Sequence, residues 1–138
     1  MSLLNFARTD VETCFRQTTL QAAASHMKDK KVGCLVVVEE DIPVGILTDR
    51  DIVTRVVAVG GAPQTTKVAE VMTPAPVTLV EELGLFEALE IMKDKGVRRF
   101  PVINAEGRLS GFFTVDDVLY LFGLEMGAVA RIVNNDIA

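Results

Sequence analysis

Tryptophan is absent from this sequence, and histidine and cysteine are scarce, which limits the chemistry that its side chains can supply. Cys14 and Cys34 do not have the C-x-x-C spacing of a metal site, and we expect both to be reduced, as in a cytoplasmic protein. His26 is the one histidine, and no cysteine or carboxylate stands at a metal-ligand spacing from it. We therefore expect no metal site and no catalytic histidine.

The sequence also lacks an excess of basic residues and any long apolar run. It has 14 basic and 19 acidic residues, a net charge of −5 and a pI near 4.9, whereas nucleic-acid-binding proteins are usually basic. The longest apolar run, Cys34 to Val38, is far shorter than the about 20 residues that cross a bilayer. Residues 1–8 lack the features of a secretory signal. We expect neither nucleic acid nor a membrane as a partner.

The sequence does contain an internal repeat. The tetrapeptide Met27–Lys30 recurs 65 residues later, and residues 45–53 recur in similar form 66 residues later, at 111–119. A unit of about 60 residues buries too little surface to be robust alone, so we expect the two to pack as one pseudo-symmetric body. The predicted division is a first repeat at 8–59, a linker at 60–66, a second repeat at 67–123 and a C-terminal helical tail at 124–138.

Apolar spacing, turn residues and caps predict the same order of elements in each repeat: helix, strand, strand, helix. The elements predicted in the first repeat are a helix from Thr18 or Thr19 to about Lys31, strands at 34–38 and 44–47, and a helix from 48 or 49 to about 58. Those predicted in the second are a short strand at 77–79, a helix at 83–95, strands at 100–103 and 109–113, and a helix at 115–122. One helical turn is predicted at 68–72, and a terminal helix at 124–133 is expected to pack on the body. The fold class is therefore α/β (α+β), with two pseudo-symmetric repeats that are each a small β-sheet with flanking helices.

The repeated motif is Gly-apolar-apolar-Thr-x-x-Asp at a strand-to-helix junction, and it occurs at 45–51 and 111–117. The first turn of a helix presents free N–H groups and a partial positive charge, which favour a phosphate. A threonine hydroxyl can donate to that phosphate, and an aspartate one turn later can accept from ribose hydroxyls. The same residues also form a capping box, so helix capping alone would explain them, and the two roles can coexist.

Three segments together resemble a tandem CBS-domain pair, the regulatory unit called a Bateman module. They are GILTDRDI at 45–52, VMTPAPVT at 71–78 and VRRFPV at 97–102, and the resemblance extends from about Asp10 to Phe122. It implies a non-catalytic protein that binds adenosine-containing ligands (AMP, ADP, ATP, NAD or S-adenosylmethionine) in two clefts between the repeats. The adenine nucleotide would then be a regulatory ligand, and no catalytic cofactor is expected.

The resemblance also assigns residues to the two clefts. Thr48 and Asp51 would bind the phosphate and the ribose in one cleft, and Thr114 and Asp117 would do so in the other. The further contacts that it implies are Thr66, Val71 and Met72 at the adenine of the Asp51 cleft, residues near Thr13 and Cys14 in the Asp117 cleft, Val32, Gly33 and Cys34 from the first repeat, and Val97, Arg98 and Arg99 from the second.

The two repeats differ in their cations. The second has Arg98 and Arg99 where the first has Gly33 and Cys34, and Arg50 lies inside the first motif. Since arginine binds phosphate through paired donors, we expect the Asp51 cleft to be the better site for a polyphosphate. The simpler interpretation is that these arginines are surface charges that balance nearby carboxylates.

No nucleophile elbow, P-loop or zinc pattern is present, so an enzyme is not expected. Modules of the kind that the chain resembles pair into homodimers, and the apolar helices around Val56 and Leu119 fit such a partner. A ligand that shifts the arrangement of the repeats would then pass a signal to a separate effector protein, which the sequence does not identify. The alternative is a structural or dimerisation pair with no physiological ligand.

Overall fold

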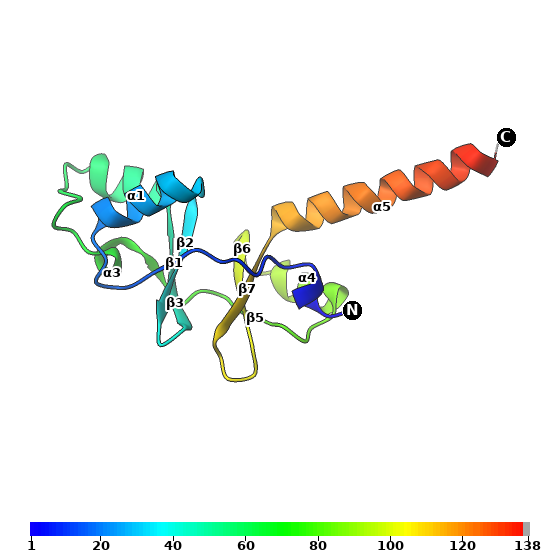
Figure 1. Ribbon diagram of the computed structural model, residues 1–138, viewed down its shortest axis with the longest axis horizontal. Helices are drawn as coiled ribbons and strands as arrows, with labels where there is room; N and C mark the ends of the chain where they lie inside the picture. Colours follow the sequence, from blue (N-terminus) through cyan, green and yellow to red (C-terminus); the bar gives the residue numbers. More distant parts are fainter. Residues whose placement is uncertain (137–138) are drawn as a thin grey trace.

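A computed structural model of the chain describes residues 1–136, which form two halves of similar build. The halves lie side by side with their strands toward the middle, and the last helix extends away from the body (Figure 1). The first half contains β1 (Thr13–Cys14), α1 (Leu20–Lys30), β2 (Cys34–Glu39), β3 (Ile42–Thr48), α2 (Asp49–Ile52), η2 (Val53–Val57), α3 (Val68–Val71) and β4 (Thr73–Pro74). The second half contains η1 (Leu3–Asn5), β5 (Leu79–Val80), α4 (Leu85–Met92), β6 (Arg99–Ile103), β7 (Leu109–Thr114) and α5 (Val115–Asp136). The predicted fold class is confirmed.

Each half is built on a small sheet around one antiparallel hairpin. In the first half β2 pairs antiparallel with β3, β1 runs parallel to β2, and β4 adds antiparallel to β3. In the second half β5 runs parallel to β6, which pairs antiparallel with β7. The first hairpin turns through Glu40 and Asp41 at φ 51° and 65°, whereas the second turns through Gly107 at φ 79°. These two turns differ in length, and the offset between the repeats changes here from 65 to 66 residues.

Each sheet packs with its helices around a separate hydrophobic core. α1 begins after Thr19, whose Oγ1 accepts a hydrogen bond of 3.2 Å from the N–H of Ala22, and the helix turns Leu20 and Met27 inward. The first core is formed by Leu20, Ala23, Met27, Leu35, Val37, Leu47, Val56, Val68 and their neighbours. The second core is formed by Leu3, Leu79, Ala88, Met92, Phe100, Val102, Phe113 and Val118. The space between the halves is therefore left to polar and half-buried side chains.

Each half is completed by a short helix that lies, in the sequence, directly before the other repeat. η1 precedes the first repeat and packs on the second half, and α3 precedes the second repeat and packs on the first half. Leu3 of η1 and Val68 of α3 are both 0% exposed, Leu3 in the second core and Val68 in the first. The N–H of Leu3 donates to the carbonyl oxygen of Leu83 over 2.6 Å. Arg8 then bridges to Phe112 of β7, as β4 pairs with β3 in the first half. The turn at 68–71 was predictable from the sequence, but its counterpart at residues 3–5 was missed.

The motif glycines allow these crossing segments to approach the sheets. A Cβ added at Gly111 would stand 3.0 Å from the carbonyl oxygen of Arg8, and one at Gly45 would stand 3.2 Å from the carbonyl oxygen of Thr73. Both distances are shorter than ordinary van der Waals contacts. The glycine that opens each motif is therefore required for close backbone approach.

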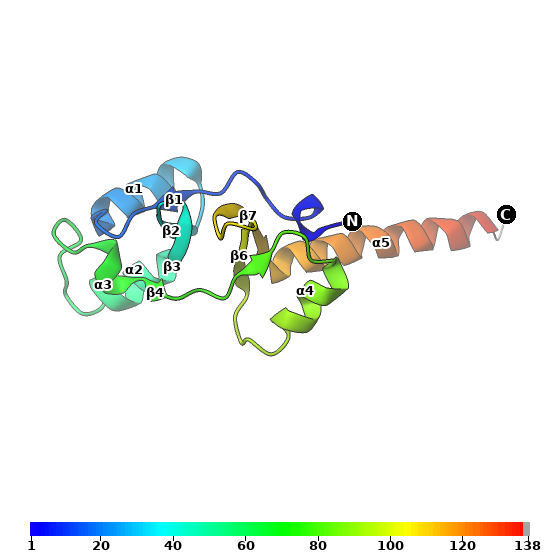
Figure 2. The ribbon, with the colours of Figure 1, turned by 90° about the horizontal axis from the view of Figure 1, so that it is seen from below.

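The C-terminal tail differs from the prediction. Residues 115–136 form one continuous helix of 22 residues, and residues 122–136 are all exposed (Figures 1 and 2). The expectation of a separate terminal helix packed on the body is therefore wrong. Gly123, which could have ended the helix, does not adopt a positive φ, and a glycine inside a helix costs only about 1 kcal/mol. Residues 137 and 138 of the predicted tail lie outside the described residues.

The helix after the first motif also differs in form. α2 is a single α-helical turn that continues as a π-helix, in which the N–H of Ala58 donates to the carbonyl oxygen of Val53 over 2.9 Å. Thr54 Oγ1 donates to the carbonyl oxygen of Arg50 over 2.8 Å, and such a bond competes with regular helix geometry. The β-branched residues of this segment further weaken the α-helical form. The predicted helix is thus present, with a wider second turn.

Candidate functional site

Thr48 and Asp51 of the first motif form a closed capping box at the start of α2. Asp51 Oδ2 accepts from the N–H of Thr48 over 2.9 Å, and Thr48 Oγ1 accepts from the N–H of Asp51 over 3.1 Å. The other carboxylate oxygen, Asp51 Oδ1, lies 3.6 Å from Arg55 Nη2, and this side chain is 15% exposed. Arg55 also donates to the carbonyl oxygen of Val71 over 2.7 Å. The cap leaves the lone pairs of Asp51 Oδ1 and the hydroxyl hydrogen of Thr48 for further partners.

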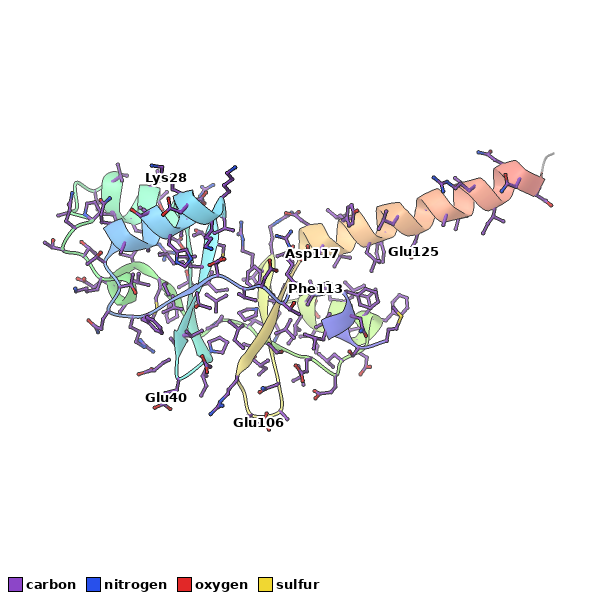
Figure 3. All side chains as sticks on the ribbon, viewed as in Figure 1. Lys28, Glu40, Glu106, Phe113, Asp117 and Glu125 are labelled. Carbon is purple, nitrogen blue, oxygen red and sulfur yellow. The ribbon has the colours of Figure 1, made fainter. Side chains whose placement is uncertain are left out.

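The second motif repeats this box with Thr114 and Asp117. Asp117 Oδ2 accepts from both the N–H and the hydroxyl of Thr114, each over 2.9 Å, and Asp117 Oδ1 lies 3.4 Å from Arg8 Nη2. Asp117 lies where β7 joins α5, near the middle of the molecule (Figure 3). Each motif aspartate therefore has an arginine beside its Oδ1. Arg55 comes from the adjacent helix, whereas Arg8 comes from the segment that precedes β1.

The Asp51 cleft is a cavity of about 350 Å³ between the two halves. It brings together five of the predicted residues, namely Thr48 and Asp51 from the first half and Val97, Arg98 and Arg99 from the second. The chain that links the halves, residues 73–77, forms a further wall that consists mainly of proline, alanine and valine. An acidic group, two guanidinium groups and an apolar wall thus border one cavity.

Four other residues predicted for this cleft are not in its lining. Arg50 lies on the exposed face of α2, and Thr66 donates through Oγ1 to the carbonyl oxygen of Ala62 over 2.8 Å in the loop before α3. Val71 and Met72 are buried in the first core, which also contains Val68 of α3. The structure therefore places residues 73–77 at the cavity in place of residues 66–72.

The Asp117 cleft is a second cavity of about 300 Å³, lined by Thr114 but not by Asp117, whose Oδ2 is engaged by Thr114 in the capping box. The predicted residues Val32, Gly33 and Cys34 line it from the first half. Thr13 and Cys14 do not, and residues 8 and 10–12 take that place. Subtracting the 65-residue repeat offset from 73–77 gives 8–12, so the repeat itself contained the signal for this wall. Lys31, Arg99 and Asp116 also line this cleft, and none of them was predicted for it.

The two cysteines are free, and burial makes both of them poor nucleophiles. Loss of hydration raises the pKa of Cys34 to about 11, against a smaller opposing effect of the nearby Arg99 charge. Burial likewise raises the pKa of Cys14 to about 11. At neutral pH both are therefore protonated thiols.

Within residues 1–136, no three His, Cys, Asp or Glu side chains gather where they could hold a metal ion. No helix in that part of the chain combines the length and the apolar character needed to cross a membrane.

The molecule consists of two repeated α/β halves, and each half is completed by a segment from outside it. Paired clefts lie between the halves. This architecture defines a class of proteins in which two small repeats form one body. The family model of the CBS domain matches the chain twice, at residues 4–58 and 68–123. Since these matches cover most of the sequence, the chain belongs to the CBS domain family, as a tandem pair.

The relatives agree with this assignment. The chain is 36% identical over 120 residues to an uncharacterized protein of Methanopyrus kandleri, and the match covers 86% of this chain but only 61% of that protein. It is 37% identical over 101 residues to Hypoxic response protein 1 of Mycobacterium tuberculosis, covering 72% of this chain and 70% of that protein. A crystal structure of Hypoxic Response Protein I with two coordinated zinc ions has a TM-score of 0.75 and 31% identity, covering 87% of this chain and 98% of that chain. CBSX2 from Arabidopsis thaliana in complex with AMP shares the fold, with a TM-score of 0.72 and 23% identity over 91% of this chain and 98% of that chain.

Proposed function

We propose that this protein is a non-catalytic regulatory module that binds an adenine nucleotide in the Asp51 cleft. The observation that carries the proposal is the convergence of Thr48 and Asp51 from one half with Arg98 and Arg99 from the other on one cavity of about 350 Å³. Small-ligand sites combine such a volume with apolar walls and a few convergent polar groups. The solved AMP complex of CBSX2, which shares the fold, supports a nucleotide as the class of ligand.

The groups around the cavity match the parts of a nucleotide. Asp51 Oδ1 accepts from the ribose hydroxyls, while its Oδ2 stays in the capping box. Arg98 and Arg99 supply paired donors and positive charge to the phosphates, and the Thr48 hydroxyl donates to the same group. The apolar residues 74–77 form the wall against which the base packs. Two arginines favour ATP or ADP over AMP, NAD and S-adenosylmethionine.

Binding is tested by thermal shift and calorimetry with AMP, ADP, ATP, NAD and S-adenosylmethionine. A ligand at 100 times its Kd stabilises the protein by about 2.7 kcal/mol per site. Asp51→Asn keeps the side-chain volume and should reduce the shift by the contribution of the Asp51 cleft, whereas Glu125→Gln, on the exposed part of α5, should not change it (Figure 3). A shift with none of the five ligands would favour the alternative, a structural or dimerisation pair without a physiological ligand.

Signalling follows from a ligand that contacts both halves. Such a ligand favours the relative orientation of the halves in which Asp51 and Arg98 both reach it, so it shifts the population toward that orientation. No part of this step requires bond chemistry. A separate effector protein would respond to the change, and the two free cysteines support a cytoplasmic location for this protein.

We also infer that the exposed face of α5 binds a second copy of the chain. An apolar stripe of Leu119, Phe122, Met126, Val129 and Val133 follows alternating steps of three and four residues, and all five side chains are at least 43% exposed. This is the spacing with which one helix packs against another that has the same spacing. A second α5 is such a helix. A free α5 would otherwise keep the stripe in water at considerable cost.

Light scattering after gel filtration tests this pairing. Met126→Glu places a charge in the stripe and should convert a dimer into a monomer. Leu124→Glu lies on the opposite face of the same helix, has a similar exposure of 54%, and should remain a dimer. A monomeric unsubstituted protein, or equal effects of the two substitutions, would contradict the pairing through α5.

A further inference from the structure

The two clefts have side chains in common. Arg99 lines both the Asp51 cleft and the Asp117 cleft. Arg98 lines the Asp51 cleft, and its Nη2 lies 3.1 Å from Oδ1 of Asp116, which lines the Asp117 cleft. The start of β6 therefore connects the two cavities through one shared guanidinium and one ion pair.

The first half offers no equivalent connection. Gly33 and Cys34 occupy the positions that correspond to Arg98 and Arg99, and both line only the Asp117 cleft. Neither can carry a positive charge, since glycine has no side chain and a cysteine thiol is neutral or anionic. Every cation that could serve both clefts thus comes from the second half.

The charges around the clefts make this sharing consequential. The Asp117 cleft is lined by three cations, Arg8, Lys31 and Arg99, and by three carboxylates, Asp10, Glu12 and Asp116. If Arg99 turns toward the other cleft, the carboxylates outnumber the remaining cations. If Arg98 also leaves Asp116, that carboxylate loses its partner and adds to the repulsion of an anion.

We propose that Arg98 and Arg99 make the two clefts antagonistic toward phosphate-bearing ligands. A polyphosphate in the Asp51 cleft recruits both guanidinium groups, which withdraws positive charge from the Asp117 cleft and frees Asp116. A second anionic ligand then binds more weakly, and by linkage a ligand in the Asp117 cleft weakens the first to the same degree. This inference rests on the proposed nucleotide binding and concerns its regulation.

The coupling is measured with ATP by calorimetry. Asp51→Asn leaves the Asp117 cleft as the main site, and Lys31→Glu, which reverses a charge that lines only the Asp117 cleft, leaves the Asp51 cleft, so each affinity is obtained alone. In the unsubstituted protein the second ATP should bind about fivefold more weakly than ATP binds to the same cleft alone, which is the lower end of typical coupling. The ratio of these two dissociation constants measures the coupling. Because the charges are exposed, high salt should bring this ratio close to one, which tests the unsubstituted protein directly.

Two further variants separate sharing from simple charge. Arg99→Gln should bring the ratio closer to one, because the shared cation is gone and only the Arg98–Asp116 ion pair still connects the clefts. Lys31→Gln removes a cation that lines only the Asp117 cleft, so it should weaken that cleft without changing the ratio. Adenosine, which has no phosphate, should show no coupling.

The outcomes also distinguish this inference from the proposed function. Binding of two ATP molecules with a ratio of one overturns the coupling and leaves nucleotide binding intact. A ratio that Arg99→Gln leaves unchanged, or that high salt does not reduce, overturns the role of these arginines. The absence of any ATP binding overturns the proposed function, and the coupling with it.

Discussion

Replacing Leu3 with alanine tests whether the segment before β1 belongs to the core of the second half. Leu3 is 0% exposed and lies in the second core with Leu79, Phe100 and Phe113. Truncation of a buried leucine costs about 2–5 kcal/mol, which includes the cavity left behind. Domains of this size are stable by only about 5–15 kcal/mol, so Leu3→Ala should remove a large share of the stability. We expect the Tm to fall by about 6–20 °C.

Thermal unfolding followed by circular dichroism measures the loss, and hydrogen exchange locates it. In Leu3→Ala the amides of β6 and β7 should lose protection before those of β2 and β3. Val68→Ala, at the corresponding position of the first half, should show the reverse order. Leu124→Ala, at an exposed position of α5 opposite the apolar stripe, is the control and should leave exchange in both sheets unchanged. An unchanged Tm in Leu3→Ala, or an early loss of protection in β2 and β3, would refute this packing.

Three further predictions concern single sites. Gly111→Ala places a Cβ 3.0 Å from the carbonyl oxygen of Arg8 and should destabilise the protein by about 1–3 kcal/mol in urea unfolding. As a control, the Cβ added by Gly123→Ala meets open space on a helix, and this substitution should stabilise the protein by up to about 1 kcal/mol. Equal effects of the two substitutions would contradict the close approach at Gly111. Thr48→Ala removes a helix cap and should cost about 0.5–2 kcal/mol without ligand, and no loss would mean that the capping box carries no stability. Burial raises the pKa of Cys34 from 9.0 to about 11, so its alkylation at pH 8 should be roughly 100-fold slower than in the unfolded chain. The rate, followed by mass spectrometry, should then increase about tenfold per pH unit up to pH 11. A rate that levels off near pH 9 would exclude the raised pKa.

The parts of the site that depend on local geometry could be predicted from the sequence. Thr48 and Asp51 are three residues apart, and side chains of these types at that spacing form a capping box when they stand at the start of a helix. The repeat then places Thr114 and Asp117 in the same arrangement. Arg98 and Arg99 were assigned to the cleft by the resemblance to CBS-domain pairs, in which the start of the middle strand contacts the ligand, and both line the cavity.

The parts that depend on contacts distant in sequence could not. Val71 and Met72 were expected at the ligand, but a single helical turn does not reveal which of its sides enters a core. Leu3 was missed because its partners lie about 80 to 110 residues further along the chain. The extent of α5 was missed because the repeat ends near Phe122, and the residues beyond it have no counterpart from which to infer an end.

The length of α5 turns a small motion at the clefts into a large one far from them. Its 22 residues extend about 33 Å from a base at Val115, whose N–H donates to the carbonyl oxygen of Arg98 over 3.0 Å. A tilt of about 5° at this base moves the far end by about 3 Å, as a lever arm would. An adjustment at Arg98 too small to reshape either cavity would therefore change which residues of α5 meet a neighbouring molecule.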